Sequence, residues 1–204
     1  MSDPHACPSA ETKQSLRRSA LAARDAILAE ERARLSAAIC ARARELPELV
    51  QASTVMIFAS FRTEIDTDPL IAWALAAGKT VALPRIAGPR KMLAFRVDDL
   101  RQDLEPGTWD IPEPTQACEP VDPGDIDAVV VPGAAFDCDG HRCGYGGGFY
   151  DNFLPQTRED VPRVALAFEA QIVDELPCEA HDLPVTVIVT EDRVIRPGEA
   201  PAAT

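Results

Sequence analysis

Residues 127–151 of this chain, DAVVVPGAAFDCDGHRCGYGGGFYD, decide its fold. The opening run DAVVVP is almost wholly apolar, which predicts a strand buried at the centre of a sheet. Four glycines follow within residues 144–148, and residues 149–154 have the pattern of a short helix. A glycine-rich turn lets backbone N–H groups converge on one anion, and the start of a helix adds partial positive charge. We therefore expect a phosphate-binding loop beyond the carboxyl ends of the strands.

The spacing of this loop excludes two common phosphate-binding motifs. A Walker loop needs Lys and then Ser or Thr after its last glycine, and neither follows Gly148. A dinucleotide-binding GxGxxG that begins at Gly144 would need glycine where Phe149 stands. A glycine-rich surface turn remains the alternative. Arg142 and Asp151 favour the phosphate loop, because they offer a cation for phosphate and a carboxylate for Mg²⁺.

Outward from the loop, the sequence predicts an α/β fold. Residues 9–46 contain helix formers without Gly or Pro, so we expect an N-terminal pair of helices with a break near Ala29. A strand over residues 54–61, a helix over 67–77 and a strand over 80–83 form a βαβ unit, which predicts parallel pairing. Further strands are expected over residues 92–97, 127–132, 164–168 and 185–190, with an irregular segment over 98–116 and a short helix or turn over 170–176. With no internal repeat or linker, we expect one three-layer α/β/α domain over residues 1–204, with a central, mostly parallel sheet and flexible tails at 1–10 and 197–204.

Composition narrows the class of protein. The 204 residues are 46% hydrophobic and hold 20 Lys and Arg against 33 Asp and Glu, a net charge of −13. This charge disfavours broad binding to nucleic acid or to a membrane surface. The first ten residues lack the features of a secretory signal, no run approaches the roughly 18 apolar residues of a membrane span, and the six cysteines form no CxxC. We expect reduced thiols and a cytoplasmic protein.

Three cations share one face of the first predicted helix. At about 100° per residue, Lys13, Arg17 and Arg24 fall within roughly 40° of one another. They border the apolar stripe of Leu16, Ala20, Ala23 and Ile27, while Arg18 points elsewhere. Residues 1–44 carry 8 basic and 5 acidic side chains, in contrast to the acidic remainder. The stripe predicts an anion clamp, with long side chains that reach past the core into water as the alternative.

Five sets of residues, taken in chain order, point to one known family. They are Lys13-x-x-Leu16-Arg17, Phe58-Ala59-Ser60 with Glu64, Gly78-Lys79 to Pro84-Arg85, Glu113-Pro114, and VPGAAFDCDGHRCGYGGGFYD at residues 131–151. Together they resemble the 5-formyltetrahydrofolate cyclo-ligase family, also called 5,10-methenyltetrahydrofolate synthetases, over residues 13–190. The final R-x-G-Y-G-G-G-F-Y-D is highly specific, whereas the other motifs are weak alone.

The resemblance implies a ligase of folate one-carbon metabolism. Such an enzyme converts 5-formyltetrahydrofolate to 5,10-methenyltetrahydrofolate with ATP and Mg²⁺, and releases ADP and phosphate. The formyl oxygen attacks the γ-phosphate, and the folate N10 then displaces phosphate from the activated carbon of the imidate phosphate. Catalysis of this kind needs positioning and charge neutralisation rather than a nucleophilic side chain. We expect a monomer whose partner is the small-molecule folate.

The resemblance also implies roles for individual residues. Lys13 and Arg142 would be catalytic. The ATP-binding set would be Lys13, Arg17, Arg142, Gly144, Tyr145, Gly146, Gly147, Gly148, Phe149 and Tyr150. Asp151 and Asp182 would hold Mg²⁺. Glu64, an acceptor-only carboxylate, would bind the pterin edge, and Ala59, Trp109 and Tyr145 would line the folate pocket.

Three positions depart from the family pattern. Cys143 stands where leucine is usual, Trp109 falls near a position often held by glycine, and Asn152 replaces a common basic residue. None of these changes removes a group that the chemistry needs. They predict local differences in the wall of the folate site.

Other readings of the same residues remain open. Cys138-x-x-His141 and Cys178-x-x-His181, with Cys143, offer ligands for a structural zinc. Asp137-x-Asp139-Gly140 resembles the start of a calcium loop, although a turn at Gly140 explains it better. A non-catalytic protein that binds nucleotide or folate, or a related ATP-dependent ligase, is the alternative function.

Overall fold

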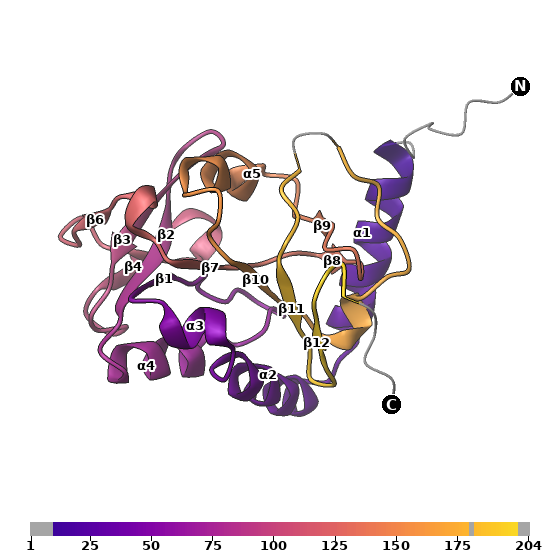
Figure 1. Ribbon diagram of the computed structural model, residues 1–204, viewed down its shortest axis with the longest axis horizontal. Coiled ribbons are helices and arrows are strands. Elements are labelled where there is room, and N and C mark those ends of the chain that lie inside the picture. The colour runs from indigo at the N-terminus through magenta and orange to yellow at the C-terminus, as the bar shows by residue number, and fades with distance from the viewer. Residues whose placement is uncertain (1–9, 180–181, 200–204) are drawn as a thin grey trace, which may run out of the picture.

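An eight-stranded sheet organises the computed structural model, which describes residues 10–179 and 182–199 (Figure 1). Its strands are β1 (Thr54–Met56), β2 (Thr80–Gly88), β3 (Lys91–Arg96), β6 (Pro120–Val121), β7 (Ala128–Val131), β10 (Arg163–Leu166), β11 (Val187–Val189) and β12 (Val194–Ile195). In the order β12-β11-β10-β7-β1-β2-β3-β6, the strands from β11 to β2 are parallel and the other three pair antiparallel. The predicted α/β class with a mostly parallel sheet is confirmed.

Helices cover both faces of this sheet. Three of them, α2 (Ala29–Ala43), α3 (Pro47–Gln51) and α4 (Asp68–Ala76), lie on one face, and α5 (Phe149–Phe153) lies on the other (Figure 1). Successive strand side chains point to opposite faces, so Val130 of β7 packs with α2, α3 and α4 while its neighbour Val129 packs with Phe153 of α5. All four residues of β7 are fully buried, as a central parallel strand requires.

The strand boundaries around β1 and β2 differ from the prediction. The expected strand over residues 54–61 ends at Met56, and the strand expected to close at Pro84 continues to Gly88. Met56 and Ala82 are the last register pair of β1 and β2. Pro84 has no N–H with which to extend that ladder, so residues 57–61 leave the sheet. On its other side β2 pairs antiparallel with β3, where the missing donor does no harm.

Short elements that the sequence did not predict lie between the main strands. The segment 98–116, expected to be irregular, contains a hairpin of β4 (Leu104–Pro106) and β5 (Pro112–Pro114) with the 3₁₀ turn η1 (Thr108–Asp110) at its tip. A second small hairpin pairs β8 (Ala135–Phe136) with β9 (Arg142–Cys143). Three further 3₁₀ turns are η2 (Pro123–Asp125), η3 (Leu154–Gln156) and η4 (Glu169–Gln171), the last overlapping the start of the predicted helix or turn over 170–176.

The first helix, α1 (Ala10–Asp25), stands at one end of the molecule beside β8 and β9 (Figure 1). Its separation from α2, which begins at Ala29, follows the predicted break. Ala20 of α1 packs with Ala135, Cys143 and Leu176 in a small apolar cluster. The predicted stripe is wrong at Ala23, which is exposed, because α1 contacts the body of the protein along a narrower line.

The expected tails at 1–10 and 197–204 lie for the most part outside the described residues. Within the described part of the chain, no helix combines the length and apolar character that crossing a bilayer would take.

Candidate active site

A cavity of about 750 Å³ opens where β1 and β7 end. It is lined by α1, by the loop after β1, by β2 and β3, by the β4–β5 hairpin, by the glycine-rich loop, and by Glu179 and Asp182. Every site residue expected from the sequence lines it: Lys13, Arg17, Ala59, Glu64, Trp109, Arg142, Gly144, Tyr145, Gly146, Gly147, Gly148, Phe149, Tyr150, Asp151 and Asp182. The fold therefore brings together residues from five distant parts of the chain.

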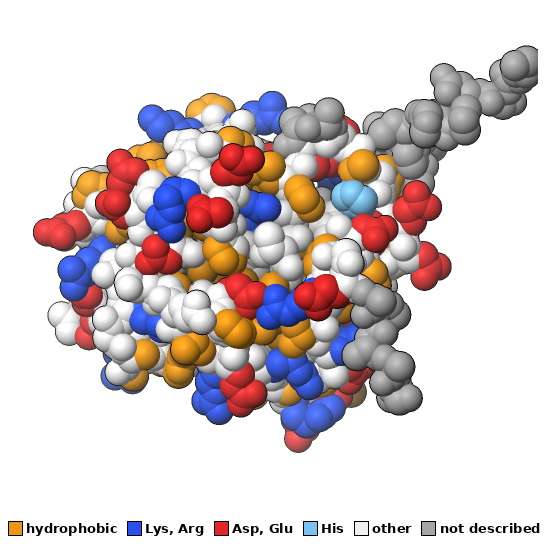
Figure 2. Space-filling model, in the orientation of Figure 1, with side chains coloured by type: hydrophobic (Ala, Val, Ile, Leu, Met, Phe, Trp, Pro, Cys, Tyr) orange, Lys and Arg blue, Asp and Glu red, His pale blue; other side chains and the backbone are white. Residues whose placement is uncertain are grey.

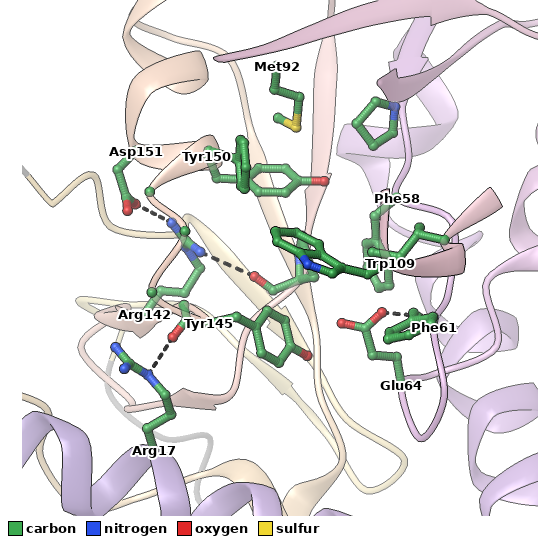
Figure 3. Close-up of a pocket in the computed structure, with 18 of the residues that line it drawn as sticks. Arg17, Phe58, Phe61, Glu64, Met92, Trp109, Arg142, Tyr145, Tyr150 and Asp151 are labelled. Carbon is green, nitrogen blue, oxygen red and sulfur yellow. Dashed lines mark hydrogen bonds and ion pairs between the residues drawn. The ribbon is translucent and has the colours of Figure 1, made fainter. Parts of the chain in front are cut away.

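The cavity has two chemically different ends. Figure 3 shows Arg17, Arg142 and Asp151 at one end, and Glu64 with Phe58, Phe61 and Trp109 at the other. On the outer face drawn in Figure 2, by contrast, the described Lys and Arg side chains are interspersed with Asp and Glu. A cation-lined end suits an anion such as a phosphate chain, and an aromatic end with a carboxylate suits a flat heterocycle with N–H groups.

The glycine-rich loop is shaped so that cations lie against its backbone. Gly146 has φ +93° and Gly148 has φ +66°, in the left-handed region that favours glycine. A Cβ at Gly144 would lie 3.0 Å from Nη1 of Arg142, and a Cβ at Gly146 would lie 3.5 Å from Nη1 of Arg17. The guanidinium groups of Arg142 and Arg17 thus lie close beside the backbone of Gly144 and Gly146. This cradle fits a phosphate chain held by backbone N–H groups and arginines.

Each of three basic residues at this end has a defined partner. Nε of Arg17 donates to the carbonyl of Gly144 at 2.8 Å. Arg142, whose side chain is only 6% exposed, forms an ion pair with Asp151 and donates to the carbonyl of Pro132 (Figure 3). Nζ of Lys13 lies 2.8 Å from Oδ2 of Asp182, so the two side chains form an ion pair.

The heads of the α1 cations do not reach past the core into bulk water. Burial alone would lower the pKa of Lys13, but the hydrogen bond and charge of Asp182 outweigh it and hold the pKa above its usual value. Arg24 is 7% exposed, and Lys13, Arg17 and Arg24 all line the cavity. Arg18, by contrast, is exposed as expected. This geometry favours the anion clamp over the alternative of solvated heads.

The carboxylates at this end suit a Mg²⁺ ion that is shared with substrate phosphates, rather than one held by protein ligands alone. Within residues 10–179 and 182–199, no three His, Cys, Asp or Glu side chains gather into a possible metal site. Mg²⁺ is commonly held by one or two carboxylates together with substrate phosphates and waters. Asp151 and Asp182 both line the cavity and could serve in this way, each now balanced by a cation.

The structure gives no support to the zinc site or the calcium loop that the sequence left open. His181, one of the four CxxH ligands considered for zinc, lies outside the described residues, and His141 binds the carboxylate of Asp137 through Nδ1 at 2.9 Å. Asp137 also accepts hydrogen bonds from the backbone of Asp139 and His141, and so closes a turn. Gly140 in this turn has φ +88°, which confirms the turn rather than a calcium loop.

At the opposite end, Glu64 belongs to a small polar network. It accepts a hydrogen bond from the backbone N of Phe61 at 2.9 Å (Figure 3). Burial raises the pKa of Glu64, and a hydrogen bond from Tyr145 and the charge of Arg24 oppose that rise. Arg24 in turn donates to the hydroxyl of Tyr145 at 2.6 Å. The carboxylate thus faces the cavity with acceptor capacity left for a ligand.

Aromatic side chains form the wall beside Glu64. Trp109 meets the ring of Phe149 edge to face, with centroids 6.2 Å apart. It is 63% exposed, so it is not ordinary core packing. Its backbone has φ +58°, in the region that favours glycine. This conformation fits the family pattern, in which glycine is often found near this position. The hydroxyl of Tyr150, also in the wall, is buried without a hydrogen-bond partner among the described residues.

Sequence reasoning missed several lining residues. Arg24 carried a signal, because helical spacing placed it beside Lys13 and Arg17, yet it was not assigned to the site. Phe61, Met92 and Arg90 line the cavity from loops and strands whose approach only the fold determines.

Comparisons with known proteins identify the family of this chain. The model of the 5-formyltetrahydrofolate cyclo-ligase family matches residues 9–191. The 5-formyltetrahydrofolate cyclo-ligase of Escherichia coli K12 is 34% identical over 177 residues, which cover 84% of this chain and 96% of that protein. The Mus musculus protein of the same name is 31% identical over 193 residues, 90% of this chain and 91% of the mouse protein. An NMR structure of Aquifex aeolicus 5,10-methenyltetrahydrofolate synthetase is similar with a TM-score of 0.81 and 34% identity, over 94% of this chain and 96% of that one.

Proposed function

Since this chain belongs to the 5-formyltetrahydrofolate cyclo-ligase family, we propose that it is an ATP-dependent ligase that converts 5-formyltetrahydrofolate to 5,10-methenyltetrahydrofolate. The reaction would consume ATP with Mg²⁺ and release ADP and phosphate. One observation carries the proposal: a single cavity joins a cation-lined glycine loop to an aromatic wall with a carboxylate. These two ends match the two substrates that the reaction must bring into contact.

At the glycine-loop end, we assign ATP to Lys13, Arg17, Arg142 and residues 144–150. The left-handed glycines expose backbone N–H groups, and the arginines supply charge in a geometry that suits phosphate oxygens. Asp151 and Asp182 would hold Mg²⁺, which neutralises charge on the phosphates when bound. Arg142 and Lys13 would then exchange their carboxylate partners for phosphate oxygens.

At the aromatic end, we assign the pterin to Glu64, Ala59, Trp109 and Tyr145. A carboxylate can only accept hydrogen bonds when ionised, so Glu64 suits the N–H groups of an amino-pyrimidine edge. Tyr145 lies between the two ends in Figure 3, where it can contact both substrates. Arg24, through the Tyr145 hydroxyl, favours the ionised form of Glu64.

The proposed reaction requires side chains that position the two substrates and neutralise phosphate charge, and it needs no nucleophilic side chain. Transfer of the γ-phosphoryl group to the formyl oxygen gives an imidate phosphate. Attack of N10 on the formyl carbon, with loss of the N10 proton, then closes the ring and expels phosphate. Among the described residues that line the cavity there is no Cys, His or Ser. Lys13 and Arg142 would stabilise the charge that develops on the transferred group.

A spectroscopic assay tests the proposal. Closure of the ring extends the conjugation, so the methenyl product absorbs at longer wavelength than 5-formyltetrahydrofolate. We expect the absorbance to rise only when protein, ATP, Mg²⁺ and 5-formyltetrahydrofolate are all present. Lys13→Gln should abolish the rise, while Lys91→Gln, at an exposed lysine outside the cavity, should keep it. Folded protein that binds both ligands by titration calorimetry without any rise would favour the non-catalytic alternative.

A further inference from the structure

Three alternate glycines of the loop each lie against an arginine from a different part of the chain. Besides Arg142 over Gly144 and Arg17 over Gly146, a third arginine covers Gly148. A Cβ at Gly148 would lie 3.0 Å from Nε and 3.2 Å from Nη2 of Arg90. Arg142 comes from β9, Arg17 from α1, and Arg90 from the turn between β2 and β3. Three guanidinium groups thus lie beside the loop.

The β2–β3 turn is built to hold Arg90 at this place. The register of the two strands shifts between Ile86 and Gly88, and Arg90 itself has φ +55°, an uncommon conformation for a residue with a side chain. Nδ2 of Asn152 donates to the carbonyl of Arg90 at 3.2 Å and to the carbonyl of Gly148 at 2.9 Å. One amide therefore ties the tip of the hairpin to the end of the glycine loop.

Among the described residues, Arg90 differs from its two counterparts because its guanidinium group has no hydrogen-bond partner. Arg142 is paired with Asp151, and Arg17 donates to a carbonyl. In the part of the chain that the structure describes, the Arg90 guanidinium makes no hydrogen bond or ion pair, although it lines the cavity and is exposed. Nearby, Lys13 is balanced by Asp182. Arg90 and Arg17 are therefore cations at this end that no carboxylate of the described residues neutralises.

An arginine held in an uncommon backbone conformation, beside an anion-binding loop and without a counter-ion, has the properties of a ligand-binding group. We infer that Arg90 is a third phosphate-binding arginine, which binds the phosphate chain of a nucleoside triphosphate held at residues 144–148. Asn152 acts as its positioning residue, because it fixes the hairpin against the loop. The inference rests on the proposed function, and deepens it by adding a residue that neither the sequence nor the family motif assigned.

Nucleotide binding without folate tests the inference. Titration calorimetry would compare ATP and AMP on the wild type, Arg90→Gln and the neighbouring Lys91→Gln, which also removes one positive charge. Loss of one charged contact to phosphate should raise the Kd for ATP about tenfold in Arg90→Gln and leave the weaker AMP binding unchanged. Lys91→Gln should bind ATP like the wild type, and Arg90→Lys should recover part of the loss. The melting temperature of ligand-free Arg90→Gln should match that of the wild type, since the side chain has no hydrogen-bond or ion-pair partner among residues 10–179 and 182–199.

The outcomes separate the inference from the function on which it rests. ATP binding that is equal in the wild type and Arg90→Gln would overturn the inference alone. A wild type that binds no ATP would overturn the proposed function and the inference with it. For Asn152, a double-mutant cycle supplies the readout: Asn152→Ala should weaken ATP binding in the wild type and add nothing in the Arg90→Gln background. Additive effects would show that Asn152 acts independently of Arg90.

Discussion

Arg142 and Asp151, nine residues apart in the chain, form an ion pair that closes the base of the glycine-rich loop. The pair joins the end of one short strand to the first turn of α5, so the loop between them is held at both ends. The sequence predicts a ligand as the partner of Arg142. In the ligand-free protein that partner is Asp151, so Arg142 has a structural role as well.

We therefore expect Arg142→Ala to affect both stability and activity. Removal of a nearly buried guanidinium leaves Asp151 without its partner, which should cost about 1–3 kcal/mol of unfolding free energy. Activity should fall about 10²–10³-fold, as for loss of one transition-state donor. Urea unfolding and the absorbance assay measure the two effects. A double-mutant cycle with Asp151→Asn is the control, and purely additive stability losses would contradict the ion pair.

Removal of Mg²⁺ should abolish activity without loosening the fold. The described residues contain no cluster that could hold a structural metal, and Asp151 and Asp182 are already balanced by Arg142 and Lys13. A chelator should therefore stop product formation and leave the thermal unfolding of the ligand-free protein unchanged. A lower melting temperature in the chelator would reveal a metal that supports the structure.

Gly146→Ala should weaken ATP binding beyond its effect on stability. The residue has φ +93°, so alanine should cost about 1–2 kcal/mol in backbone strain, although its Cβ would only reach ordinary contact with Nη1 of Arg17 at 3.5 Å. Gly78 after α4 is the matched control, because it also has a left-handed backbone, at φ +73°, with open space around it. Gly78→Ala should lose comparable stability and bind ATP normally. Equal ATP affinities in the two variants would contradict a role for the loop backbone in phosphate binding.

Glu64→Gln should make the ligand-free protein more stable at neutral pH while it weakens folate binding. The folded pKa of Glu64 is raised above 4.5 by burial, so the fold favours the protonated form. The group stabilises the fold at low pH and loses that contribution as pH rises through the raised pKa. The stability gap between the two proteins should therefore widen with increasing pH and close in acid. Denaturation at several pH values measures it, and a gap independent of pH would contradict the shift.

In the same variant, loss of a charged acceptor should cost the folate about 2 kcal/mol of binding free energy, roughly a 30-fold rise in Kd. The affinity for ATP should stay as in the wild type, because Glu64 lies at the other end of the cavity. A variant that lost affinity for both ligands would indicate a general disturbance of the cavity.

The two tryptophans of the chain offer a direct probe of the folate wall. Trp109 lines the cavity, whereas Trp73 on α4 lies near Nζ of Lys79, outside it. In Trp73→Phe, emission from Trp109 should change when 5-formyltetrahydrofolate binds. In Trp109→Phe, emission from Trp73 should stay constant under the same titration. If emission changed in Trp109→Phe and stayed constant in Trp73→Phe, Trp109 would not belong to the wall of the folate site.

The parts of the site that follow from local rules could be predicted from sequence. Helical spacing placed Lys13 and Arg17 on one face, and the glycines of residues 144–148 marked the loop through their backbone freedom alone. What could not be predicted depends on contacts between distant segments. Arg90 reaches the loop only because β2 runs on past Pro84, and Trp109 reaches the cavity only through an unpredicted hairpin. A monomeric state, a cytoplasmic location and a single domain stay predictions.

The ion pair between Lys13 and Asp182 joins residues 169 positions apart. The apolar side chains of α1 pack against side chains from residues 135–176. A ribosome makes the amino-terminal end first. The helix that carries Lys13, Arg17 and Arg24 therefore emerges long before the segments that receive it. A nascent chain can build the β1–α4–β2 unit early, but it cannot assemble the cavity until nearly its whole length has left the exit tunnel. Catalytic competence thus comes late in the synthesis of this protein, after Asp182 has been made.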